Sequence, residues 1–176
     1  MGSKVYQKVD EDLYNAFWRK LQQFKFDITY FSVHFDACVK ALRWIKYSIV
    51  GGTAIATGVW MTWNNVSGVG TVSAVLILLL QALSAISEWF PYENRKLELR
   101  EMLTELEPLY IDMENEWRKI NRLEKTDKQI QGAILRYSQK QLDIKNHFFK
   151  DDSLPIRKRL EQKATILTSK YFEYFT

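Results

Sequence analysis

Hydrophobic residues recur at helical spacing in the first part of the chain. Apolar residues repeat every three or four positions from Val9 to Phe24, as on one face of an amphipathic helix. A second series continues the pattern: Ile28, Phe31, Phe35, Cys38, Leu42 and Ile45. Because no helix breaker separates this series from the apolar segment that follows, we expect one helix of about 35 residues there, roughly 50 Å long.

The second half of the chain carries three further helical patterns. Apolar residues alternate at steps of four and three from Leu99 to Ile120, the seam of a helix–helix pair, and Pro108 predicts a kink within it. Thr126 and Gln129 fit a capping box that starts another helix. The residues around Pro155 predict its end and the start of a last helix. No segment shows the alternation of a strand, so the sequence predicts an all-α fold.

One long segment differs from the rest, because residues 47–87 include no charged side chain. A transmembrane helix needs about 20 apolar residues, so this segment is long enough for two. We expect spans at residues 45–63 and 71–90, joined by a polar, glycine-containing loop at 64–70. The predicted architecture is a two-span transmembrane hairpin (residues 45–90) between N-terminal cytoplasmic helices (1–44) and a C-terminal cytoplasmic helical region (91–176), which form a helical bundle.

Basic residues next to the two spans predict their orientation. Lys40, Arg43 and Lys46 come before the first span, Arg95, Lys96 and Arg100 follow the second, and the loop is uncharged. Positive residues favour the cytoplasmic side of a membrane. The sequence therefore predicts a multi-pass membrane protein with both termini in the cytoplasm.

Polar residues within the predicted spans suggest a path for ions. One stripe of the second span would hold Ser73, Ile77, Gln81, Ser84 and Glu88. An unpaired amide or carboxylate in lipid is costly, so the stripe could line a water-filled path between subunits, or Gln81 could pair with Thr53 or Thr57 inside one hairpin. Small residues of the first span would allow close helix packing: Gly52, Ala56 and Gly58.

Charge is sorted along the C-terminal region. Residues 91–116 are acidic overall, whereas residues 117–176 are basic. One interpretation is a solvated helical surface that pairs with the acidic segment. The other is a binding face for an anionic ligand, with candidate residues Arg118, Lys119, Arg122, Arg157, Lys158 and Arg159.

Residues for catalysis or metal binding do not form a recognisable motif. His34 and Cys38 are spaced at i and i+4, but two ligands do not complete a structural zinc site, and Cys38 has no second cysteine to pair with. The sequence contains no glycine-rich phosphate loop and no nucleophile elbow. We expect no metal, no cofactor and no enzymatic activity.

The predicted hairpin with its flanking helices resembles the SLATT family, two-transmembrane effectors associated with SMODS nucleotidyltransferases and SLOG proteins. The similarity lies in residues 89–96 (WFPYENRK), in residues 106–110 (LEPLY) and in Glu116-Trp117. The resemblance implies a bacterial antiphage effector in the inner membrane. It also implies a partner, often a nucleotidyltransferase, that makes a nucleotide or an oligonucleotide signal.

Taken together, these features predict a homo-oligomeric pore, with a tetramer as the first guess. A nucleotide, or a DNA or RNA oligonucleotide, would gate the pore from the cytoplasm, and opening would depolarise the membrane and arrest growth. The alternative is a non-conducting membrane anchor or scaffold that recruits a cytoplasmic partner. A phage holin is a third reading, disfavoured by the large cytoplasmic part.

Overall fold

The computed structural model describes residues 10–63, 68–87, 92–149 and 156–173, and these residues form five α-helices and no strand. The helices are α1 (Glu11–Trp63), α2 (Val69–Ser87), α3 (Tyr92–Asn121), α4 (Asp127–Phe148) and α5 (Lys158–Glu173). The all-α prediction is confirmed for these residues. The two predicted N-terminal helical series belong to a single helix of 53 residues, α1.

The chain divides into two compact units. Unit 1 comprises residues 1–35 and 98–176, and unit 2 comprises residues 36–97. The helices α1 and α3 each contribute residues to both units.

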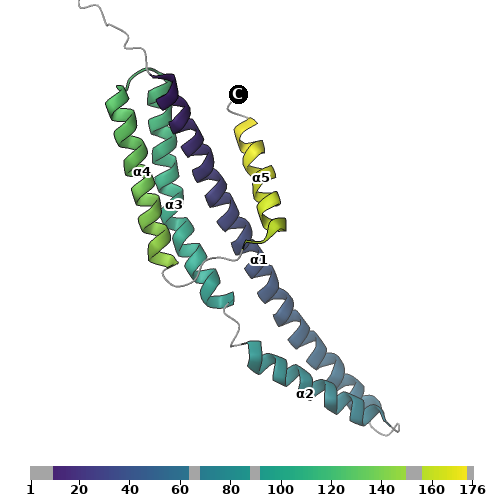
Figure 1. Cartoon of the computed structure of the whole chain (residues 1–176). Coiled ribbons are helices and arrows are strands. Elements are labelled where there is room, and N and C mark those ends of the chain that lie inside the picture. Colours follow the sequence, from purple (N-terminus) through teal and green to yellow (C-terminus); the bar gives the residue numbers. More distant parts are fainter. Residues whose placement is uncertain (1–9, 64–67, 88–91, 150–155, 174–176) are drawn as a thin grey trace, which may run out of the picture. The chain divides into compact units, whose positions relative to one another are not determined.

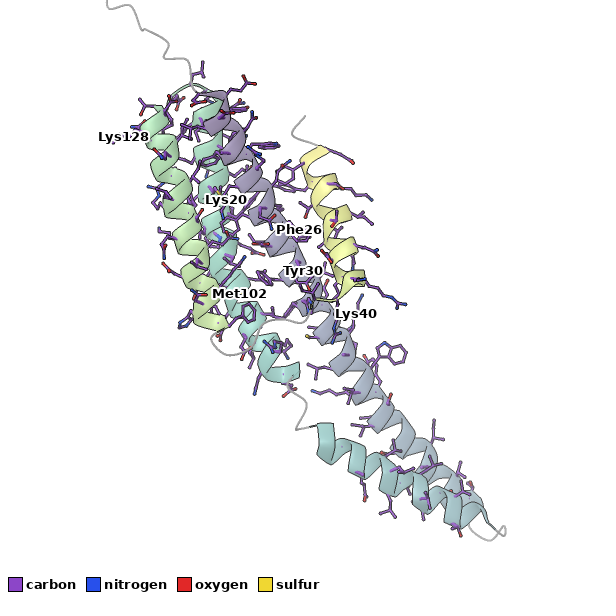
Figure 2. The ribbon with its side chains drawn as sticks, viewed as in Figure 1. Lys20, Phe26, Tyr30, Lys40, Met102 and Lys128 are labelled. Carbon is purple, nitrogen blue, oxygen red and sulfur yellow. The ribbon has the colours of Figure 1, made fainter. Side chains whose placement is uncertain are left out.

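Unit 1 is a helical bundle in which α3 and α4 run beside the N-terminal half of α1 (Figure 1). Its core contains the predicted seam of α3, because Leu99, Leu103, Leu106, Tyr110, Met113, Trp117 and Ile120 are all buried. These side chains pack with Phe17, Leu21 and Phe24 of α1 and with Ile130 of α4, which are also fully buried. In Figure 2, Met102 lies on the bundle side of α3, whereas Lys128 extends outward from α4.

Two local predictions in unit 1 have different outcomes. The capping box is confirmed, because the backbone N–H of Thr126 donates to the side-chain oxygen of Gln129 at 3.0 Å. Pro108 lies inside α3, which continues through it, and the kink expected there stays a prediction. Leu106 and Leu109 are buried on either side of Pro108, so packing holds this part of the helix in the bundle.

Helix α5 covers another side of unit 1. The ring of Phe172 packs edge-on against Trp18 of α1, and the Tyr171 hydroxyl donates to Glu114 of α3 at 2.9 Å. At the start of the helix, the backbone N–H of Arg157 donates to the Tyr30 hydroxyl at 3.4 Å.

Unit 2 contains α2 and the C-terminal part of α1, which lie side by side (Figure 1). Among the described residues, no helix has both the length and the mean hydropathy that crossing a membrane requires. Helix α2 carries Thr71, Ser73, Gln81 and Ser84 among its apolar residues, and α1 carries charged residues as far as Lys46. The predicted two-span transmembrane hairpin, and with it the multi-pass inner-membrane location with cytoplasmic termini, is therefore wrong.

Candidate functional site

The contact between α1 and α2 uses small side chains. Ala56 of α1 is buried, and Ser73 of α2 is only 2% exposed. At Gly52, an added Cβ would lie 3.0 Å from Cδ1 of Leu80, so the glycine allows Leu80 to approach α1 closely. An added Cβ at Gly58 would meet nothing within 4 Å. Of the three predicted packing residues, Gly52 and Ala56 lie at the helix contact and Gly58 does not.

Unit 2 exposes many large apolar side chains. We call this set the apolar surface of unit 2. Its members are Val50, Ile55, Met61, Val72, Val75, Leu76, Leu78 and Leu79, whereas Trp44 and Tyr47, nearer the start of unit 2, are exposed but are not counted in it.

A groove with a volume of about 510 Å³ lies between the two helices of unit 2. Its lining is almost entirely apolar and consists of Gly52, Ile55, Ala56, Val59, Gly68, Val72, Ser73, Leu76 and Leu80. Several of these residues also belong to the apolar surface, so the groove and the exposed side chains around it form one continuous apolar region.

The predicted pore-lining residues do not share one environment. Ser73 is buried, Ile77 is half-buried, and Gln81 and Ser84 are exposed, while Glu88 lies outside the described residues. The hydroxyls of Thr53 and Thr57 donate to carbonyls one turn earlier in α1, at 2.7 and 2.8 Å. The stripe therefore includes both a contact with α1 and exposed positions.

The predicted ligand-binding cations of α3 are adjacent to acidic residues. Arg118 forms an ion pair with Glu114 at 2.7 Å, and Lys119 lies 3.5 Å from Glu116. Desolvation would raise the pKa of Glu116, but its hydrogen bond with Lys125 and the charges of Lys125 and Lys119 lower that pKa below its ordinary value. Arg122 is exposed at the end of the helix.

The other predicted cations lie at a different level of unit 1. Arg157, Lys158 and Arg159 are exposed at the start of α5, where the N–H of Arg157 donates to Tyr30 of α1. Arg118 directly follows Trp117, whose ring packs against Trp18 of α1. Tyr30 and Trp18 are separated by about 18 Å along α1. The structure therefore does not bring the two predicted groups of cations together.

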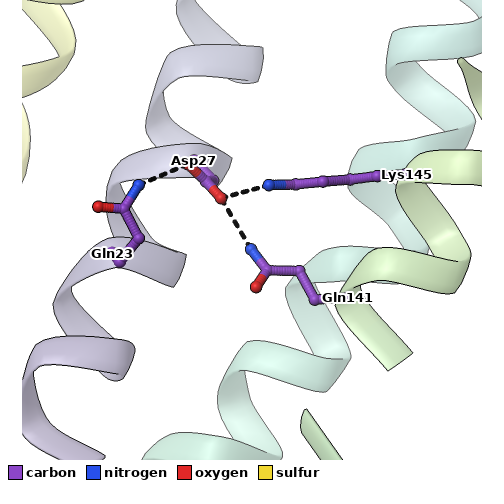
Figure 3. Close-up of polar contacts among 4 residues, drawn as sticks. All are labelled: Gln23, Asp27, Gln141 and Lys145. Carbon is purple, nitrogen blue, oxygen red and sulfur yellow. Dashed lines mark hydrogen bonds and ion pairs between the residues drawn. The ribbon is translucent and has the colours of Figure 1, made fainter. Parts of the chain in front are cut away.

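A polar cluster between α1 and α4 was not apparent from the sequence (Figure 3). Asp27 accepts hydrogen bonds from Gln23 at 3.0 Å and from Gln141 at 2.8 Å, and it forms an ion pair with Lys145. Gln141 is only 3% exposed, so its amide depends on Asp27 for a partner that water cannot readily replace. Because Asp27 and Lys145 are far apart in sequence, no local pattern could have indicated this pair.

A second cluster joins α1, α3 and α5. The ammonium group of Lys25 lies over the rings of Tyr171 and Tyr110, at 3.9 and 4.9 Å from their centres. Burial lowers the pKa of Lys25, with the charges of Glu114 and Glu107 opposing the shift. Burial also raises the pKa of Tyr110, and the neighbouring Tyr171 adds to this effect. Both clusters connect helices within the bundle.

His34 is buried and its ring contacts Tyr30, and Cys38 is buried one turn later. Within the described residues, no group of three or more histidine, cysteine, aspartate or glutamate side chains could hold a metal ion. Comparison with protein-family models, with curated proteins and with solved structures gives no match to this chain.

Proposed function

We propose that this chain is a non-enzymatic helical scaffold that self-associates through the apolar surface of unit 2. The observation that carries the proposal is the exposure of α2. This helix has no charged residue at any position, yet only one of its faces packs against α1. Its exposed side chains include Val72, Val75, Leu76, Leu78 and Leu79, and large apolar side chains in such number are normally covered, so α2 needs a further partner.

A second copy of the chain is the partner that we propose. The side chains that protrude from the apolar surface and the groove that could receive them belong to the same unit, so two copies would be complementary to each other. A stable interface buries about 800 Å² on each partner, and the apolar surface of unit 2 offers several large, exposed side chains toward such an interface. Monomers rarely leave so large an apolar patch in water.

The sequence suggested a pore or, alternatively, an anchor or scaffold, and of these a scaffold needs no membrane span. The pore expected from the sequence relied on the two spans, and nothing in the structure tests it, so it stays a prediction. The described charged clusters support a non-enzymatic role, because Asp27, Lys145 and Lys25 make contacts between helices of the bundle. A role in antiphage defence rests on the resemblance to the SLATT family and stays a prediction.

A pair of matched leucine variants tests self-association. Leu78 of α2 and Leu135 of α4 are equally exposed, at 64% and 65%, but only Leu78 lies on the apolar surface of unit 2. In sedimentation velocity without detergent, we expect Leu78→Lys to shift the protein toward the monomer at concentrations where Leu135→Lys stays associated. Equal behaviour of the two variants would contradict the proposal.

Vesicle flotation separates this proposal from binding to lipid. We expect the associated wild-type protein to remain in solution with phosphatidylcholine vesicles. If monomers float with the vesicles and Leu78→Lys abolishes flotation, the apolar surface contacts lipid and the proposal is wrong.

A further inference from the structure

A second groove in unit 2 is basic. It has a volume of about 300 Å³ and is lined by Val39, Leu42, Arg43, Lys46 and Tyr47 of α1 and by Glu93 and Lys96 of α3. Arg43, Lys46 and Tyr47 are spaced at i, i+3 and i+4, so they share one face of α1. The groove thus gathers three cations around one carboxylate.

Among the described residues, the cations of the groove are not engaged in ion pairs of the kind seen in unit 1. Arg118, Lys119, Lys125 and Lys145 each lie within 4.0 Å of a carboxylate oxygen, whereas no such ion pair joins Arg43, Lys46 or Lys96 to another described residue. Glu93 offsets one of the three positive charges, so the lining keeps a net charge of about +2, and like charges that lie close together repel one another. The groove is therefore a concave, positively charged surface that favours an anionic ligand.

The remaining lining indicates what the ligand carries besides charge. Tyr47 is 66% exposed, so its ring is available to a planar or apolar group, and Leu42 and Val39 extend the apolar side of the groove. The cations suit phosphate oxygens, which arginine binds in bidentate fashion and lysine binds as a point charge. The volume is that of a small-molecule site at the low end of the usual range.

We propose that this groove binds a small phosphorylated anion, with Arg43, Lys46 and Lys96 on the phosphate and Tyr47 against the rest of the molecule. The ligand is a free phosphorylated compound or the headgroup of a phospholipid, since both present the same chemistry. The site does not depend on self-association. Its lining residues belong to unit 2, whereas the cations at residues 118–122 and 157–159 that the sequence indicated belong to unit 1.

Calorimetric titration with inorganic pyrophosphate and with phenyl phosphate tests the site directly. We expect both probes to bind at low ionic strength and to bind more weakly at about 0.15 M salt, where charges are more strongly screened. The double variant Arg43→Gln/Lys46→Gln should weaken pyrophosphate binding about tenfold. Tyr47→Ala should weaken phenyl phosphate binding more than pyrophosphate binding.

The matched control removes two exposed cations elsewhere. Lys163→Gln/Lys170→Gln, at two exposed positions of α5, loses the same charge as the double variant in the groove, and we expect its pyrophosphate affinity to stay within about twofold of the wild type. Circular dichroism melts of both double variants should match that of the wild type, which excludes unfolding as the cause. Equal losses in the two double variants would show an effect of net charge and would overturn the proposal.

A vesicle-binding experiment distinguishes a free phosphorylated compound from the headgroup of a phospholipid. If the protein binds phosphatidylcholine vesicles that contain phosphatidylglycerol, and Arg43→Gln/Lys46→Gln abolishes that binding, the ligand is a lipid headgroup. If pyrophosphate binds and the vesicles do not, the ligand is a free compound. Failure of all probes overturns the proposal, and it leaves self-association untouched because the Leu78→Lys comparison reports on that separately.

Discussion

The ammonium nitrogen of Lys25 lies 3.9 Å from the centre of the Tyr171 ring, and this contact joins α1 to α5. Tyr171 in turn donates to Glu114 of α3, so one small cluster connects three helices. An ammonium over an aromatic ring is stabilised by the electrons of the ring face, and more so when it is shielded from water. The contact therefore helps to hold α5 on the bundle.

The same cluster predicts a loss of stability at alkaline pH. Burial raises the pKa of Tyr110, Tyr137 and Tyr171, so the folded state keeps protons that the unfolded chain releases above its tyrosine pKa of 10.0. The free energy of unfolding should therefore fall as pH rises above about 10. The pKa of Lys25 is lowered, which acts in the opposite direction between its folded value and 10.5.

Urea unfolding at about pH 9 and about pH 11 measures this loss. Tyr110→Phe should reduce it, because one buried phenol no longer titrates. Lys25→Met should enlarge it, because the opposing group is gone, and Tyr47→Phe, at an exposed ring, is the control. A loss of stability that is identical in all three variants would show that these buried groups are not its source.

The Asp27 cluster predicts a specific cost for removing one carboxylate. Asp27→Ala leaves the buried Gln141 amide and the Lys145 ammonium without their partner, so we expect a loss of about 1–3 kcal/mol in unfolding free energy. Asp143→Ala removes an exposed carboxylate that only accepts from Gln139 within the same helix, and it should cost less than about 0.5 kcal/mol. Chemical denaturation compares the two, and similar costs would contradict the assignment.

The end of α3 predicts a stabilising substitution. Leu123 has a φ of 58°, a left-handed conformation that is unfavourable for residues with a Cβ. It occupies the position after the helix at which glycine is preferred, since its N–H donates to Ile120 and the N–H of Glu124 donates to Lys119. Leu123→Gly should therefore raise the unfolding free energy by about 1 kcal/mol.

The control for this substitution is Leu135→Gly. Leu135 is also exposed but lies inside α4, where glycine should cost about 1 kcal/mol. Thermal melts give the sign of each effect. Destabilisation by both glycines would mean that the strain at Leu123 does not contribute.

The close approach of Leu80 to α1 predicts different outcomes at two adjacent glycines. Alanine at Gly51 would meet nothing within 4 Å and should stabilise the helix by about 0.5–1 kcal/mol. Alanine at Gly52 would place its Cβ 3.0 Å from Leu80, so it should gain less or lose stability. Hydrogen exchange of the amides in residues 50–56 compares the variants, and an equal gain would argue against this contact.

The sequence indicates the helices of unit 1 well because their signals are local. The seam from Leu99 to Ile120 is buried as its spacing predicts, and the capping box begins α4 as expected. Pro108 lies within α3, and buried residues on both sides of it accompany a continuous helix. The Asp27–Lys145 pair joins residues 118 positions apart, which no pattern in a single sequence reveals.

The uncharged segment, residues 47–87, led to the main incorrect prediction, which was the transmembrane hairpin. Its composition indicated a membrane, whereas no helix among the described residues combines the required length with the required mean hydropathy. That interpretation also assigned Arg43, Lys46 and Lys96 to the flanks of membrane spans, although the structure places them around one groove. Charges that are distant in sequence become a site only when the fold brings α1 and α3 together within unit 2.

The mass of the unmodified protein in detergent-free buffer is the most direct test of self-association. Sedimentation equilibrium over a range of concentrations should give a multiple of the 20.9 kDa chain, with four chains, about 84 kDa, as the first expectation. A dimer or trimer would retain the account and correct the number of copies. A mass of 20.9 kDa at every concentration, from a protein with the expected helical circular dichroism, would contradict it.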